Sequence, residues 1–192
     1  LQLKDTVKLT IEVTNPTKDK SRKVQHKHFL PKEVRADDVV DSRGFTVRFD
    51  EKKELAFLTK EEEFSPGETK RYDVLIKDVW KFPMVRADEI DKRVAAAWPE
   101  LEGTIYDKSA KFLIEEINTK VKQIRDSQEL TLNTEQHIGV FRLNEKRYAE
   151  AKNNCDLLEK LLSVVRTKKL KKLESGKVQN VLMKLKALRG LA

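Results

Sequence analysis

The spacing of the apolar residues changes at Trp80-Lys81-Phe82-Pro83, and this change limits the chain to a mixed architecture. Before it, short segments alternate apolar and polar residues and end at Pro, Gly or Asn, which is typical of antiparallel strands. After it, apolar residues recur every three or four positions over long segments, which is typical of amphipathic helices. We therefore expect an α+β multidomain chain, with a β domain at residues 1–82 and a helical domain at 83–192.

Several segments of the first half have the alternation of a strand with one buried face. The clearest is Leu3 to Val13, and Asn15-Pro16 ends it because proline lacks the amide donor that a sheet ladder needs. The other expected strands are 24–30, 45–49, 55–59 and 72–76. The segment Val34 to Asp41 is ambiguous and fits a short helical turn.

The order of these signals resembles a known family. The signals, in chain order, are the alternating run Val7 to Val13, then Asn15-Pro16, Phe29-Leu30-Pro31, Phe64-Ser-Pro-Gly-Glu68 and Tyr72-Asp-Val-Leu-Ile76. This order resembles the conserved-repeat immunoglobulin-like domain of bacterial and archaeal surface proteins, over residues 1–80. Two departures are the proline after Asn15, where the family usually has a nearby glycine, and His28-Phe29, where an acid is frequent. The resemblance implies a non-catalytic immunoglobulin-like antiparallel β-sandwich in a large envelope or exported protein.

The second half predicts an antiparallel helical hairpin or a three-helix bundle. The expected helices lie at 85–98, 104–127, 134–170 and 177–189. Pro99 ends the first and Gly176 separates the last. Six apolar residues between Leu157 and Val165 make the apolar face of the third helix too wide for one partner helix, so we expect the final helix to fold against it.

The positive charge lies at the C-terminal end. Residues 166–192 hold nine basic side chains and one acid, which accounts for the whole formal net charge of +8. Such a segment could contact an anionic partner. The candidate contacts are Lys168, Lys169, Lys171, Lys172, Lys184, Lys186 and Arg189. Apolar residues at helical spacing run through the same segment, which favours the interpretation that the charges are the solvated face of a packed helix.

No set of residues predicts catalysis, and we expect no catalytic residue, bound metal or cofactor. His26 and His28 lie two apart on an expected strand, as metal ligands can, but no third ligand lies nearby in the sequence. The acids Asp37, Asp38 and Asp41 lack the spacing and the central glycine of calcium loops.

Three further groups have plain structural interpretations. Cys155 is the single cysteine and lies in an apolar stripe, which predicts a buried thiol. The acids Glu61 to Glu63 would protect an edge strand against sheet-to-sheet pairing. The aromatic residues Phe112, Phe141 and Tyr148 align with Leu and Ile at helical spacing, which favours a helical core over a platform for nucleic-acid bases.

Large apolar residues surround the switch between the two halves. The connection from Lys77 to Ala87 contains no Ser or Gly, unlike a flexible linker. We expect Trp80, Phe82, Met84 and Trp98 to pack at the inter-domain junction and to fix its angle.

These patterns favour a non-enzymatic structural or interaction module, of spacer or adhesion type, in a larger bacterial envelope-associated protein. The expected partners are other proteins or neighbouring domains of the same chain. The alternative is a nucleic-acid or anionic-surface binding module that acts through the basic C-terminal helix. No apolar run approaches the ~20 residues of a membrane span. The start without Met suggests a fragment, and the expected location is extracytoplasmic or cell-envelope associated.

Overall fold

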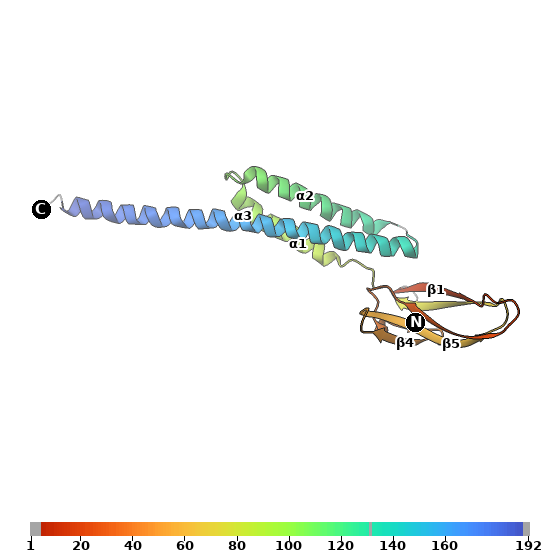
Figure 1. Ribbon diagram of the computed structural model, residues 1–192. Coiled ribbons are helices and arrows are strands. Elements are labelled where there is room, and N and C mark those ends of the chain that lie inside the picture. Colours follow the sequence, from red (N-terminus) through yellow and green to blue (C-terminus); the bar gives the residue numbers. More distant parts are fainter. Residues whose placement is uncertain (1–4, 131, 190–192) are drawn as a thin grey trace. The chain divides into compact units, whose positions relative to one another are not determined.

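The computed structural model describes residues 5–130 and 132–189 (Figure 1). The chain is α+β, as the sequence predicts: within the described residues, two three-stranded antiparallel sheets precede three long helices. It divides into two compact units. The first comprises Leu1–Lys81 with Leu132–Ile138, and the second comprises Phe82–Thr131 with Gly139–Ala192.

The strands of the first unit form two separate sheets. One sheet has the order β1-β6-β3, with β1 at Thr6–Thr14, β6 at Thr69–Lys77 and β3 at Val39–Asp41. The other has the order β2-β5-β4, with β2 at Arg22–Phe29, β5 at Leu55–Phe64 and β4 at Thr46–Asp50. The ambiguous segment contains both β3 and a 3-10 turn at Ala36–Asp38. Three residues are too few for an alternating pattern to reveal a strand.

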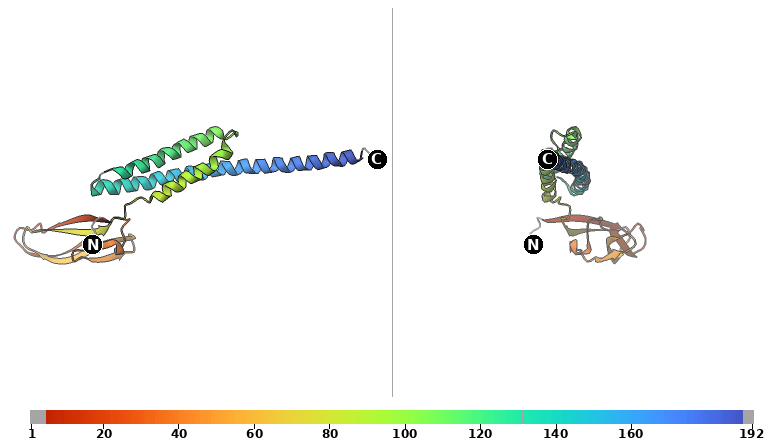
Figure 2. Two further views of the ribbon diagram at one scale, coloured as in Figure 1. Left: turned by 180° about the vertical axis from the view of Figure 1, so that it is seen from behind. Right: turned by 90° about the vertical axis from the view of Figure 1, so that its left-hand side faces the viewer.

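The two sheets form two layers of the first unit (Figures 1 and 2). Leu58 of β5 and Val74 and Ile76 of β6 are completely buried, at the alternate positions that a two-residue period requires. A hydrogen bond also joins the two sheets: the Tyr72 hydroxyl on β6 donates to the Glu62 carboxylate on β5 at 2.7 Å.

Asn15 fixes the end of β1 through its completely buried side chain. Its amide nitrogen Nδ2 donates to the carbonyl oxygens of Lys20 at 3.0 Å and Ser65 at 2.9 Å. Its oxygen Oδ1 accepts from the Thr17 hydroxyl at 2.7 Å. One buried side chain therefore joins the loop after β1 to the turn after β5, and its own polar atoms are satisfied.

The second unit contains α1 at Met84–Leu101, α2 at Asp107–Asp126 and most of α3, which spans Thr134–Arg189. The expectation that Pro99 ends the first helix is wrong, since Pro99 lies inside α1. Proline removes one amide donor, and so close to the helix end the loss is tolerated. The chain leaves the helix at Gly103, whose φ of 69° favours glycine.

The three helices share their buried faces. One apolar cluster includes Ile90 of α1, Ile117 of α2 and Cys155 of α3, and a second includes Leu101 of α1 and Leu158 of α3. At the other end of α2, the buried amide of Asn144 on α3 donates a 2.7 Å hydrogen bond to the Ser127 hydroxyl. No helix in the described part of the chain has the length and apolar character to cross a membrane.

We expect Asn15→Ala to lower the free energy of unfolding of the first unit by about 3 kcal/mol, because it removes the hydrogen bonds that this buried side chain makes to two loops and leaves a cavity in its place. Urea unfolding followed by Trp80 fluorescence, in a Trp98→Phe background, would measure the change. Asn118→Ala, at an exposed position of α2, is the matched control and should change the stability little. Equal effects of the two substitutions would contradict the role of Asn15.

Candidate interaction surface

One face of α3 packs against the other helices as far as Val165. The buried residues recur every three or four positions, as one helical face requires. They are Ala151, Cys155, Leu158, Leu162 and Val165. Arg93 of α1 supports this packing by donating hydrogen bonds to Glu159 at 2.8 Å and to Asp156 at 2.5 Å, both on α3. These hydrogen bonds raise the pKa of Arg93 and lower the pKa of both carboxyl groups.

Beyond Val165 the helix continues to Arg189, and most of this stretch extends past the ends of α1 and α2 (Figures 1 and 2). We call residues 166–189 the α3 extension. Its described side chains are all exposed, including Leu170 at 60% and Met183 at 63%. The expected break at Gly176 and the separate helix at 177–189 are therefore wrong, as is the prediction that this segment folds back. A glycine inside a helix costs only about 1 kcal/mol relative to alanine. The favourable helix propensities of the nearby Lys and Leu residues offset this cost.

The candidate anionic contacts lie on this extension. Lys168, Lys169, Lys171 and Lys172 have exposed side chains. Lys184, Lys186 and Arg189 lie within α3, but their side chains are outside the described part of the structure. The base of the extension contacts the helical unit at two points. Arg166 pairs with Glu100 of α1, and the Lys168 amine lies 3.2 Å from the hydroxyl of Tyr106, which immediately precedes α2.

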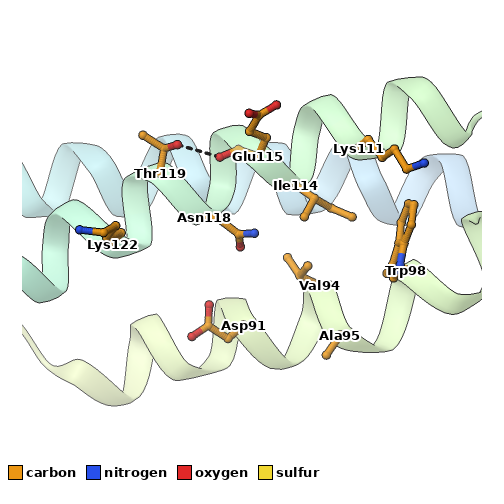
Figure 3. A pocket seen from close by; sticks show the side chains of 10 residues that line it. All are labelled: Asp91, Val94, Ala95, Trp98, Lys111, Ile114, Glu115, Asn118, Thr119 and Lys122. Atoms are coloured by element: carbon orange, nitrogen blue, oxygen red, sulfur yellow. Dashed lines mark hydrogen bonds between the residues drawn. The ribbon is translucent and has the colours of Figure 1, made fainter.

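A groove of about 580 Å³ lies between α1 and α2 (Figure 3). Val94, Trp98 and Ile114 form its apolar part. Three of its charged side chains pair along or across the helices: Asp91 with Arg125 at 2.7 Å, Lys111 with Asp107 at 3.0 Å and Lys122 with Asp126 at 2.8 Å. The hydroxyl of Thr119, which also lines the groove, donates a 2.9 Å hydrogen bond to the backbone carbonyl of Glu115.

The first unit contains a polar centre around Glu62. The carboxylate accepts hydrogen bonds from Lys70 at 2.8 Å and from Tyr72 at 2.7 Å, and it pairs with Lys60 at 2.9 Å. These donors lower the pKa of Glu62 to about 2, while burial and the carboxylate raise the pKa of Tyr72 to about 12. For Glu62, edge protection is the wrong interpretation, because its side chain binds three partners while Glu61 and Glu63 are exposed.

His26 and His28 lie beside this centre and contact each other. Nδ1 of His26 is 3.0 Å from Nε2 of His28. His26 is buried among aromatic rings, with Phe45 at a centroid distance of 5.3 Å, and its Nε2 has no hydrogen-bond partner. Burial lowers the pKa of both imidazoles, and the nearby His28 lowers that of His26 further. Within the described residues, no cluster of three or more His, Cys, Asp or Glu side chains could hold a metal ion.

The other chemical candidates have structural roles. Cys155 is buried, and burial raises the pKa of its thiol to about 11, which keeps the thiol protonated and unreactive at neutral pH. Asp38 and Asp41 accept backbone hydrogen bonds from Arg35 and Arg43, each at 2.9 Å, so they shape the turns before and after β3. Asp37 has an exposed side chain in the same region.

The aromatic residues of the helices divide between core and surface. Phe141 and Tyr148 pack against the cluster that contains Cys155. The prediction that Phe112 belongs to the core is wrong, since its side chain is 64% exposed. Phe112 is two residues after the buried Ala110, and residues two apart do not share a helix face. The sequence contains one indication of exposed apolar residues in the helical unit, which is that the apolar face of α3 is wider than one partner helix can cover.

The four expected junction residues lie in different apolar surroundings. Trp80 is buried in the first unit, where its indole nitrogen donates a 3.3 Å hydrogen bond to Glu33. Phe82 and Met84 pack in one apolar cluster of the second unit, and Trp98 packs against the other cluster. The fixed angle between the units stays a prediction.

A comparison with protein-family models, with curated proteins and with solved structures finds no match to this chain. Its function is therefore inferred from its own residues.

The histidine pair predicts a loss of stability in mild acid. Because the folded-state pKa of His26 is below the usual 6.5, the folded protein binds the proton less tightly than the unfolded chain does. Stability is therefore complete above about pH 6.5 and falls as the pH drops below it. We expect His26→Phe to weaken the pH dependence of the unfolding free energy between about pH 7.5 and 5.5. Urea titrations at several pH values would measure it, and an unchanged slope would contradict the assignment.

The extension should be dispensable for folding. A chain that ends at Lys172 loses only side chains that are exposed wherever the structure describes them. We expect its midpoint of thermal unfolding to shift by less than about 3 °C. A chain that ends at Lys160 is the control, because it also loses the buried Leu162 and Val165 and should unfold about 10 °C lower. A similar large shift in both chains would show that the extension is packed.

Proposed function

We propose that this chain is a non-enzymatic structural and interaction module, and that the α3 extension is a surface through which it contacts a partner. The observation that supports this most directly is that α3 continues past Val165 with every described side chain exposed. Exposed apolar residues at Leu170 and Met183 accompany the basic ones, and apolar surface left open on a helix is typical of an interaction site.

We further propose that the first unit is an immunoglobulin-like sandwich. In that fold, strands B, E and D are neighbours in one sheet, and strands C and F are neighbours in the other. The order β2-β5-β4 and the pairing of β6 with β3 agree with this arrangement. A departure is that β1 pairs with β6, at the edge where the immunoglobulin fold has its last strand.

For the second unit, we propose a three-helix bundle of α1, α2 and the first part of α3, with the rest of α3 extending beyond the bundle. The resemblance of residues 1–80 to the conserved-repeat immunoglobulin-like domain is the support for placing the module in a larger, envelope-associated bacterial protein. Protein partners, or neighbouring domains of the same chain, then follow as the expected contacts.

The second candidate function is binding of nucleic acid or of an anionic membrane surface. The exposed side chains of Lys168, Lys169, Lys171 and Lys172 favour it, because clustered cations attract phosphate groups. The exposed Leu170 between these lysines favours a protein partner, since phosphate groups make no favourable contact with an apolar side chain.

Salt dependence separates the two functions. We expect duplex DNA and anionic lipid vesicles to bind weakly at about 50 mM salt and to be released at about 150 mM, because contacts with a few phosphates are lost steeply as salt rises. Fluorescence anisotropy with labelled DNA and co-sedimentation with vesicles would measure this, with Lys168→Glu/Lys171→Glu/Lys172→Glu as the charge-reversed variant. Binding that persists at the higher salt and disappears in the variant would support the second candidate and contradict the first.

A further inference from the structure

A second apolar face of α3 lies beside the buried one. Leu157, Leu161 and Val164 follow one another by four and three residues, so they share one face of the helix. Leu157 is 46% exposed, Val164 is 40% exposed and Leu161 is half-buried. The adjacent residues Leu158 and Leu162 belong to an apolar cluster shared with the other helices, and Leu161 packs against the edge of that cluster. Within the helical unit, this second face is therefore covered only in part, and Leu157 and Val164 stay exposed.

This face forms one wall of a groove between α2 and α3. The groove encloses about 550 Å³, and its other wall is formed by Phe112 and Leu113 of α2. The polar residues that line it are Lys108, Ser109 and Lys160. Its two charged side chains are therefore both lysines, and both are exposed.

The same face of α3 becomes basic where the α3 extension begins. Steps of four and three residues lead from Val164 to Lys168 and then to Lys171, with Lys172 on the next position. Lys168 contacts Tyr106 immediately before α2, which places the start of this basic strip at the end of the groove. The apolar groove between α2 and α3, with a lysine on each side, therefore leads directly into the basic strip.

We propose that the α2–α3 groove and the basic strip together bind an acidic amphipathic helix of a partner protein. Apolar side chains of that helix, spaced by three or four residues, fill the groove between Phe112 and Leu157. Its carboxylates lie against Lys108 and Lys160, and an acidic continuation lies along Lys168 to Lys172. This inference rests on the proposed interaction role of the extension and names the class of partner.

The charges distinguish this occupant from two others. A second copy of the chain would bring another basic segment to the same place, and like charges facing each other disfavour that contact. An anionic membrane would match the lysines, but a flat bilayer surface does not fill a recess between two helices. Helix-in-groove binding matches both the shape and the charge.

The probe is a synthetic, fluorescein-labelled peptide of about 20 residues, with leucines at helical spacing in its first half, glutamates between them, and a run of glutamates in its second half. Anisotropy at about 150 mM salt should show saturable binding to the full chain. A peptide with the leucines changed to serine keeps the charge and should bind at least about tenfold more weakly, because it cannot fill the groove.

Variants of the full chain test the two parts of the surface separately. Leu157→Ser and Phe112→Ser should each weaken peptide binding about tenfold or more. Leu143→Ser is the matched control, since Leu143 is 44% exposed on α3 and does not line the groove. Lys168→Glu/Lys171→Glu should weaken binding similarly, while Lys152→Glu, at an exposed position earlier on α3, should not. Circular dichroism would confirm that each variant keeps its helix content.

The possible outcomes separate this inference from the proposed function. If the lysine variant weakens binding but Leu157→Ser acts like Leu143→Ser, the groove is not the site, and the interaction role of the extension survives. If neither variant weakens binding, both proposals fail. Binding to anionic vesicles at the same salt that Leu157→Ser abolishes, or a dimer in light scattering that it dissociates, would identify a membrane or a second copy as the occupant and overturn the inference.

Discussion

The packed face of α3 is the constraint on which the helical unit depends. At about 1.5 Å per residue, its 56 residues extend for about 84 Å, whereas the 18 residues of α1 and the 20 of α2 extend for about 27 and 30 Å. Each of these two helices is shorter than half of α3, so together they leave part of α3 without a partner helix. The uncovered extension therefore follows from helix lengths, and the apolar groove follows from a stripe wider than α1 and α2 can bury.

The β unit depends on a different kind of interaction, in which buried and half-buried polar side chains form hydrogen bonds and ion pairs with other groups of the protein. Asn15 supplies donors to the carbonyl groups of two loops, and Glu62 gathers Lys60, Lys70 and Tyr72 between the sheets. Polar networks that are shielded from water stabilise one arrangement of strands only when each group has a hydrogen-bond partner. Among the buried side-chain nitrogen and oxygen atoms described, Nε2 of His26 is the one without a hydrogen-bond partner. Because protonation of this buried imidazole is unfavourable, the stability of the unit depends on pH.

The sequence predicted the class of each element better than its extent. Alternation identified β1, β2, β4, β5 and β6, but it could not reveal the three-residue β3. The helix-breaking tendencies of Pro99 and Gly176 were overestimated. Pro99 lies within three residues of the end of α1, and one glycine does not outweigh its helix-forming neighbours. The exposed position of Phe112 and the groove beside it depend on which faces of three helices meet, and periodicity along one helix does not contain that information.

The most direct test of the account is whether α3 is covered up to Val165 and bare beyond it. Single cysteines at Leu157, Leu158, Leu162, Val164, Val165 and Leu170, in a Cys155→Ala background, can be titrated with a thiol reagent under native conditions. The account predicts slow labelling at Leu158, Leu162 and Val165 and fast labelling at Leu157, Val164 and Leu170. Slow labelling at Leu170, as slow as at Leu162, would show that the extension is packed and would contradict the account.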